Sequence, residues 1–336
     1  MSALALCCAL PGLGAASSPP AVAVSVSETF VGSTRIIEGD RKGGGRLNFL
    51  APQCVCPVAY AGRVTRVVGG QLTDAAASWA EDAFNGTNGS FYVEFDSGMM
   101  VDILDTLSSN STLQVVGDVA SIVSVGDAFR VRRHLTVADY FGETNRAGLL
   151  AGTNSLEADN ILIPVPESQE TLTIFYCNAP GWEGWRFEDR TPAGDTVIFP
   201  ERGIIVRRLG KTKLMVPQHG AVKNQPSLVP IAPGYNLVST LRPRGNLRLV
   251  ELNLYTGDPA TGLAAGMDAV TADNIQVVNP AKSQTKTYFY SSAPGREGWF
   301  DDAWKPASKV VIPAGHPFYV VRKAPRAPFY WSVPTN

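Results

Sequence analysis

An internal duplication constrains this chain more than any other feature of its sequence. When Ala158 is placed on Ala272, an offset of 114 residues, about twenty of the fifty-one positions through Arg208 are identical without a gap. "APGWEGW" (Ala179–Trp185) thus returns as "APGREGW" (Ala293–Trp299). Repetition at a fixed offset is the signature of a duplicated structural unit. We therefore expect the C-terminal two thirds to hold two homologous units.

The sequence of each copy predicts β-strands. "TLTIFYCN" and "TKTYFYSS" are rich in β-branched and aromatic residues. "TVIFPERGIIVRR" and "VVIPAGHPFYVVRK" each indicate a strand, a turn and a second strand. We expect "VGDAFRVRRH" and "APGYNLVSTL" to open the two units as strands. "TVADYFG" and "LRLVELNLY" carry apolar residues three to four apart, which indicates one or two helical turns.

The N-terminal third also has the pattern of β-structure. "AGRVTRVVGGQLT" predicts a hairpin that turns at Gly69-Gly70. In "GSFYVEFDSG" apolar residues alternate with Tyr92 and Glu94, as in a strand with two different faces. The predicted fold is therefore all-β, with an N-terminal β domain followed by two homologous sandwich-like or barrel-like units in tandem. The predicted boundaries are 24–125, 126–220 and 221–336.

The N-terminus, "MSALALCCALPGLGAASSPP", resembles a secretory signal. An apolar run from Ala3 to Leu13 is followed by small residues. We expect residues 1–23 to be a signal or N-terminal segment, and the protein to be secreted or displayed at the cell surface. No other run of eighteen apolar residues occurs, so no membrane span is expected.

Charge and motifs argue against several classes of function. The formal net charge is −1, so no strong field attracts nucleic acid, and no nucleic-acid partner is expected. No P-loop, dinucleotide fingerprint, zinc pattern or G-x-S-x-G motif is present. The three histidines, His134, His219 and His316, have no spacing that suggests a site, and we expect His134 and His316 to be exposed. We expect no cofactor, no bound metal and no enzymatic activity.

Cys54, Cys56 and Cys177 would remain after signal removal. An odd number allows at most one internal disulfide, and Cys177 could pair with either of the other two. The preferred interpretation is three small buried hydrophobic residues.

Four residues hold equivalent places in the two copies and are candidate structural anchors. Asp159 and Asp273 could each contribute to a calcium site, but a single Asp-Asn pair supplies few ligands. We favour hydrogen bonds from backbone amides to these carboxylates, which would fix the turn into the strand. Trp185 and Trp299 recur beside a glycine and are expected to be core or corner anchors.

Other positions are candidates for an interaction surface. Trp182 is replaced by Arg296 in the second copy, and because an unpaired buried charge is costly, both are expected to point outward. The tryptophans in or near loops, Trp182, Trp185, Trp299, Trp304 and Trp331, could stack on sugars where their rings are exposed, although large aromatic residues are usually core. Arg130 and Arg132 alternate with apolar residues on a strand and could form a basic face for a partner's acidic groups or an anionic glycan.

Several stretches, in order and spacing, carry a resemblance that runs from about Thr34 to Pro334. They are "PVAYAGRVTRVVGGQLT", "FYVEFDSG", "VGDAFRVRRHLTVADYFG", "ADNILIP", "GWR", "PERGIIVRR", "GYNLV" and "FYWSVP". Together they resemble an uncharacterised family of secreted β-rich proteins known mainly from Verrucomicrobia. The resemblance implies secretion and no particular activity. The glycine-rich "GDRKGGGR" departs from it, since a plainer strand is expected there.

The sequence therefore predicts an exported structural protein that assembles with itself into a filament or layer through β-strand edges. "AVAVSVSETFV" (Ala21–Val31) is expected to act as a donated strand, with Val22, Val24 and Val26 facing a neighbour's open sheet edge. The alternative is a secreted carbohydrate-binding protein that uses the loop tryptophans.

Overall fold

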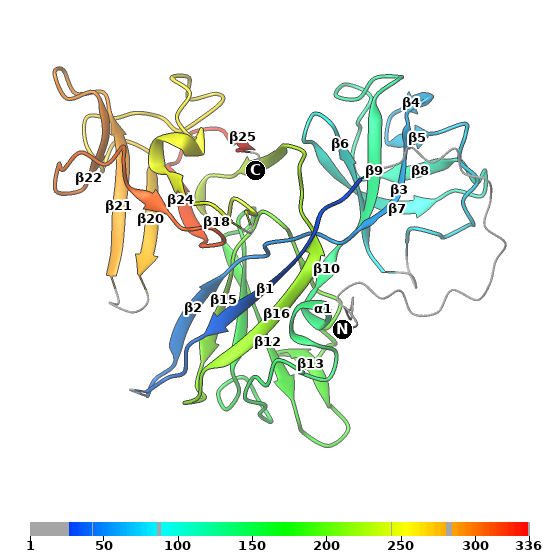
Figure 1. Cartoon of the computed structure of the whole chain (residues 1–336), viewed down its shortest axis with the longest axis horizontal. Helices are drawn as coiled ribbons and strands as arrows, with labels where there is room; N and C mark the ends of the chain where they lie inside the picture. Colours follow the sequence, from blue (N-terminus) through cyan, green and yellow to red (C-terminus); the bar gives the residue numbers. More distant parts are fainter. Residues whose placement is uncertain (1–26, 42, 86–88, 243, 280–283, 335–336) are drawn as a thin grey trace.

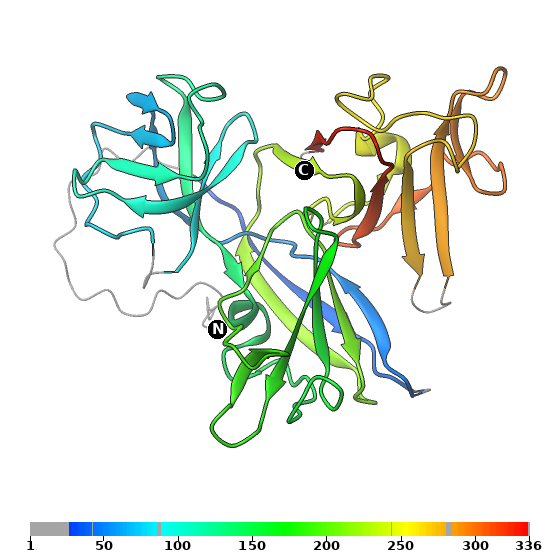
Figure 2. The ribbon, with the colours of Figure 1, turned by 180° about the vertical axis from the view of Figure 1, so that it is seen from behind.

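The computed structural model describes residues 27–336 except 42, 86–88, 243, 280–283 and 335–336. In this part of the chain the regular structure is almost all β-strand, with only two short helical turns described, which confirms the predicted all-β class. The strands gather in three lobes, each with its own hydrophobic core (Figures 1 and 2). The predicted signal at 1–23 and the donor-strand residues Val22, Val24 and Val26 lie outside the described residues.

The lobe at the upper right of Figure 1 consists of residues 58–133 and is called the inserted lobe below. Its strands form one sheet in the order β3-β9-β6-β7-β8-β5-β4. The hairpin predicted at Gly69-Gly70 is confirmed, because Val68 pairs with Gln71 across it. The strands are β3 (Val58–Arg63), β4 (Arg66–Val68), β5 (Gln71–Thr73), β6 (Phe91–Phe95), β7 (Met100–Thr106), β8 (Thr112–Val115) and β9 (Ala128–Arg133).

The lower lobe of Figure 1 is the first repeat unit. A five-stranded sheet, β13-β12-β11-β15-β2, lies with a two-stranded ribbon, β1–β16, around one core. The helical turn predicted in "TVADYFG" is confirmed as α1 (Val137–Phe141), which Thr136 and Asp139 cap reciprocally. The strands are β1 (Phe30–Ile37), β2 (Arg46–Leu50), β10 (Leu135–Thr136), β11 (Asn160–Val165), β12 (Glu170–Cys177), β13 (Gly184–Phe187), β14 (Val197–Ile198), β15 (Ile204–Arg208) and β16 (Leu214–Ala221).

The second repeat unit has the same arrangement. Its five-stranded sheet runs β22-β21-β20-β24-β18, and its ribbon is β17–β25. The predicted helical turn in "LRLVELNLY" is confirmed as the 3-10 helix η2 (Leu249–Leu252). The strands are β17 (Ser227–Ile231), β18 (Gly234–Val238), β19 (Leu247–Arg248), β20 (Asn274–Asn279), β21 (Gln284–Ser291), β22 (Gly298–Asp301), β23 (Val311–Ile312), β24 (Phe318–Arg322) and β25 (Phe329–Val333).

One asparagine in each unit shows that β2 corresponds to β18. Asn48 Oδ1 accepts from the backbone amide of Glu38 at 2.8 Å, and its Nδ2 donates to the carbonyl of the same residue at 3.1 Å. Asn236 makes the same two contacts with Ala232, at 2.9 and 2.8 Å. Glu38 directly follows β1 and Ala232 directly follows β17. The first unit therefore begins with β1 and β2.

The predicted domain boundaries are wrong for this reason. β1 and β2 pair with β16 and β15 of the first unit, whereas "VGDAFRVRRH" supplies β9, which pairs with β3 and β6 of the inserted lobe. The first unit is thus discontinuous, and the inserted lobe interrupts it between β2 and β10. In the second unit a short connection, residues 239–246, joins the corresponding strands β18 and β19.

The two units contact each other through the same turn. The turn before β15 bonds to the end of β18, where Gly203 N donates to Leu237 O at 2.9 Å and Ser239 N donates to Glu201 O at 2.8 Å. Gly315 lies at the equivalent place in the turn before β24, and its carbonyl accepts from Arg35 of β1 at 2.6 Å. Each unit therefore places this turn against the other unit.

The inserted lobe is expected to fold when it is produced alone as residues 57–134. Its core includes Trp79, Phe91 and Phe129 and draws on no residue of the repeat units. A lobe with its own core is expected to unfold cooperatively. Thermal unfolding followed by circular dichroism checks this expectation. A broad, non-cooperative transition would show that the lobe depends on the repeat units.

Candidate functional site

The loops that carry the duplicated "APG" motif contain a pair of residues that has exchanged places between the units. The Arg190 guanidinium lies 5.5 Å from the centre of the Trp182 ring in the first unit. In the second unit Arg296 lies 5.4 Å from the centre of the Trp304 ring. At the offset of 114 residues, Trp182 aligns with Arg296 and Arg190 aligns with Trp304. Both copies therefore build the same cation–π contact with the partners reversed.

This contact changes the interpretation of the predicted interaction surface. Trp182 is 43 % exposed and Arg296 is exposed, as expected. A second guanidinium, that of Arg186, lies 5.9 Å from the centre of the Trp182 ring. Arginine side chains thus occupy the ring against which a sugar would have to stack, so the geometry favours an internal contact. The signal that sequence reasoning missed was the second half of the exchange, at Arg190 and Trp304.

Reversing the pair in the first unit tests the exchange. The single variants Trp182→Arg and Arg190→Trp are each expected to lose the cation–π contact, and the double variant is expected to restore it. The coupling energy should be about 0.5–1 kcal/mol, as for exposed cation–π pairs. Urea unfolding of the four proteins measures it. Additive losses in the double variant would show that the two side chains do not interact.

The predicted basic face of β9 is not a free surface, because Arg132 is buried. Its Nε donates to Glu94 at 2.8 Å, and its Nη1 donates to Glu28 at 2.6 Å. Arg130 is mostly buried and forms an ion pair with Asp96 at 2.6 Å. The expectation of an exposed arginine strand was wrong for Arg132, since both acidic partners come from other segments of the chain.

A buried lysine extends this network to the place where the three lobes meet. Lys223, in the connection to the second unit, lies 2.9 Å from Glu201 of the first unit and 3.3 Å from Glu94 of the inserted lobe. Ser227 donates to the same Glu201 carboxylate at 2.5 Å. Burial by itself lowers the pKa of Lys223, but Glu201 and Glu94 together raise that pKa above its ordinary value. The lysine is therefore charged and links all three lobes.

The histidines differ from the expectation of exposed side chains. His134 is buried, with Nε2 3.0 Å from Asp102 Oδ1 and its ring packed on Tyr92. His316 is half-buried, with Nε2 3.1 Å from the carbonyl of Val278, and burial lowers its pKa. His219 is exposed on β16. Both corrections arise because the histidine-bearing turns lie between lobes.

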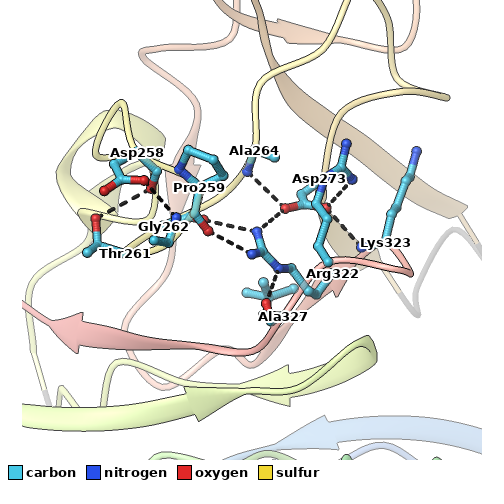
Figure 3. A network of polar contacts seen from close by, with 12 residues as sticks. Asp258, Pro259, Thr261, Gly262, Ala264, Asp273, Arg322, Lys323 and Ala327 are labelled. Carbon is cyan, nitrogen blue, oxygen red and sulfur yellow. Dashed lines mark hydrogen bonds and ion pairs between the residues drawn. The ribbon is translucent and has the colours of Figure 1, made fainter.

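Asp273 lies at the centre of a buried polar network in the second unit (Figure 3). Its carboxylate accepts from the backbone amides of Ala264 and Lys323, both at 2.8 Å. Arg322 donates to it at 2.7 Å and Arg326 at 2.9 Å. The Arg322 guanidinium also donates to three carbonyls, those of Pro259, Gly262 and Ala327.

Asp159 has the equivalent place in the first unit. It is buried, bonds to Arg208, and accepts from the backbone amides of Leu150 and Leu209, both at 2.6 Å. Arg208 and Arg322 are themselves equivalent at the offset of 114 residues. These contacts place both aspartates as structural anchors, with arginine in the position that a calcium ion would have to take. The backbone amides lie nine residues before each aspartate or fifty residues after it, so the bonds join separate segments and the expected bonds to a local turn are not the ones found.

The remaining predicted anchors lie in the cores. Trp185 and Trp299 are buried, and Trp185 Nε1 donates to the carbonyl of Gly142 at 2.9 Å. The three cysteines in the described part of the chain, Cys54, Cys56 and Cys177, are buried and free of disulfide bonds.

The ribbon of the first unit presents an uncharged outer surface, here called the ribbon face. Antiparallel pairing places Ile36 opposite Met215 and Gly32 opposite His219. Phe30, Ile36 and Met215 are 62 %, 47 % and 66 % exposed, which is high for large apolar side chains. No lysine, arginine or acidic residue belongs to the face. It consists of Phe30, Gly32, Thr34 and Ile36 of β1 with Met215, Pro217 and His219 of β16.

The same face of the second unit's ribbon is a contact surface within the molecule. Leu228 and Pro230 of β17 and Tyr330 of β25 line a cavity against the inserted lobe. The edge of β17 also pairs with that lobe, because Leu228 N donates to Gly98 O at 2.9 Å. Among the described strands β1 pairs with β16 alone, so its outer edge and the ribbon face are both uncovered there.

Among the helices of the described residues, none combines the length and the apolar character that crossing a lipid bilayer requires. Comparison with protein-family models, with curated proteins and with solved structures finds no match to this chain.

Proposed function

We propose that this protein is an exported, non-enzymatic structural subunit that associates with copies of itself through the ribbon face and the outer edge of β1. The observation that carries the proposal is the uncharged, exposed ribbon face, whose counterpart in the second unit is a contact surface. An exposed strand edge with apolar neighbours is a template for pairing with another chain. Natural proteins that remain monomeric usually place charged side chains on such an edge.

The occupant that these observations favour is a second copy. In the second unit, the inserted lobe contacts the ribbon through the residues around Gly98 and Met99. The first unit carries the same type of ribbon, and the chain's own inserted lobe already contacts the second unit. A ribbon from another copy, or a part of its inserted lobe away from Gly98 and Met99, would cover the remaining face. Contact between different surfaces of successive copies extends into a filament or layer when it does not close into a ring.

The donated-strand hypothesis changes in one respect. Phe30 and Val31 belong to β1 and pair with Ala221 and Gly220 of the same chain, so they are not available to a neighbour. A donated strand is therefore limited to the residues before Ser27, with Val22, Val24 and Val26 as its alternating face. A deletion that tests donation should end at Val26, because a longer one removes part of β1.

Charge substitution on the ribbon face tests self-association. The double variant Ile36→Lys, Met215→Lys is expected to weaken association at least about tenfold, because a close contact would bury unpaired charge. The matched control is Val270→Lys, since Val270 is 78 % exposed and lies in the second unit. Sedimentation velocity over a range of concentrations measures the effect. Unchanged sedimentation of the double variant would rule out the ribbon face as the contact.

Export rests on the sequence of residues 1–23 alone. Expression of the full chain in a secreting bacterial host is expected to yield protein outside the cytoplasm whose N-terminus begins after the small residues near Ala16. Mass spectrometry of the mature N-terminus checks this. Uncleaved protein that stays in the cytoplasm would contradict it.

A further inference from the structure

A cavity of about 290 Å³ lies where the three lobes meet. β6 and β7 of the inserted lobe form one wall with Tyr92, Met99 and Asp102. The turn between β14 and β15 forms the second wall, and β17 with β25 forms the third. Most of the lining is apolar, and its charged or titratable side chains are Asp102, His134, Glu201 and Arg202. A mostly apolar lining with a few polar groups is typical of sites for small molecules.

The charges around this cavity are balanced with one exception. Glu201 is neutralised by Lys223 at 2.9 Å, and Arg202 bonds through both terminal nitrogens to Glu167 at 2.5 and 3.2 Å. Asp102 has no lysine or arginine partner among the described residues, and its side chain contacts His134 Nε2 at 3.0 Å. The Asp102 side chain is 49 % exposed, so a molecule in the cavity can reach its carboxylate.

Two aromatic rings pack on the histidine that contacts this carboxylate, and one of them, Tyr92, is the cross-strand partner of Asp102. Tyr92 packs against His134 with 4.6 Å between ring centres, and Phe199 contacts the same histidine ring edge-on at 5.4 Å. Tyr330, 54 % exposed, stands at the rim. A carboxylate beside aromatic faces attracts an organic cation, because both the negative charge and the ring quadrupoles favour it.

We propose that this cavity binds a small organic cation, in which an ammonium group bonds to Asp102 and an apolar body packs between Met99, Leu228 and Tyr330. Because Asp102 is the one carboxylate of the cavity lining without a lysine or arginine partner among the described residues, the ligand is expected to carry a single positive charge. Because the walls are apolar, the rest of the ligand is expected to be a hydrocarbon or aromatic group. The proposal goes beyond self-association and does not depend on it, since the ribbon face of the first unit forms no part of the cavity.

Isothermal titration calorimetry with two matched probes tests the proposal on the full-length protein. The probes are 2-phenylethylammonium and its neutral counterpart 2-phenylethanol. The cation is expected to bind at least about tenfold more tightly than the alcohol, because a hydrogen bond between two charged groups is stronger than one between a carboxylate and a neutral hydroxyl. Equal binding of the two probes, or no binding of the cation up to its solubility limit, would overturn the proposal.

Two variants locate the site. Asp102→Asn keeps the shape of the side chain and is expected to weaken binding of the cation at least about tenfold. Asp105→Asn removes one negative charge from β7 at a position outside the cavity lining. The dissociation constant of the cation is expected to stay within about twofold of the wild-type value. Binding that is unchanged in Asp102→Asn, or reduced equally in both variants, would refute the assignment. If Asp102→Asn does not fold, the proposal is judged by the relative affinities of the wild-type protein for the two probes.

Discussion

Replacement of Asp273 with alanine is expected to lower the free energy of unfolding of the second unit by about 3–5 kcal/mol, the usual cost of removing one partner from a buried ion pair. Asp273 is fully buried, and it accepts hydrogen bonds from two arginines and two backbone amides. Without the carboxylate, the Arg322 guanidinium stays buried with carbonyl partners only. Urea unfolding followed by tryptophan fluorescence measures the loss.

Two further variants control this experiment. Asp302→Ala removes an exposed aspartate of the same unit and is expected to change stability by less than about 0.5 kcal/mol. Asp159→Ala removes the equivalent anchor of the first unit. It is expected to lower the free energy of unfolding by as much as Asp273→Ala does. A loss below about 1 kcal/mol in Asp273→Ala would show that this network does not stabilise the unit.

Replacement of Lys223 with methionine is expected to have a similarly large effect at the junction of the lobes. Methionine retains the apolar part of the lysine side chain but leaves the buried Glu201 carboxylate with a hydrogen bond from Ser227 as its remaining contact. The Glu94 carboxylate still has its ion pair with Arg132. The expected loss is about 3–5 kcal/mol. Adding Glu201→Gln to the same variant removes the unpaired charge and is expected to recover more than half of the loss. No recovery would mean that the charge of Glu201 is not the cause.

The pH dependence of this contribution has a definite sign. Because its acidic neighbours raise the pKa of Lys223 in the folded protein above its ordinary value of 10.5, the lysine stabilises the fold fully below pH 10.5. The stabilisation decreases as the pH rises from there through the folded pKa. The Lys223→Met variant is therefore expected to lose less stability than the wild type between pH 10 and pH 12.

Much of the local structure could be predicted from the sequence because it depends on neighbouring residues. β-Branched and aromatic residues were sufficient for β12 and β21, turn residues for the hairpin at Gly69-Gly70, and the spacing of apolar residues for the helical turn α1. The interrupted first unit could not be found in this way. β1 and β2 pair with strands more than 150 residues away, and the sequence identity between the copies begins only at Ala158.

The sites show the same division between local and distant contacts. Comparing the copies was enough to place Trp182 and Arg296 on the surface, because that argument needed only their alignment. Arg132 was predicted to be exposed but is buried. An arginine that alternates with apolar residues along a strand gives the same sequence pattern whether its side chain contacts solvent or a glutamate from a distant segment. The ribbon face was missed because β1 was expected in another domain. The junction cavity has walls from all three lobes, so no single stretch of sequence indicates it.

Amide hydrogen exchange at two protein concentrations tests self-association through the ribbon face most directly. Edge amides of a strand exchange rapidly in a monomer and slowly when another chain pairs with them. Slower exchange in Phe30–Ile37 and Leu214–Ala221 at the higher concentration, with other surface strands such as β22 unchanged, is the expected result. Exchange in β1 and β16 that is independent of concentration, in a protein that sediments as a monomer throughout, would contradict the proposal.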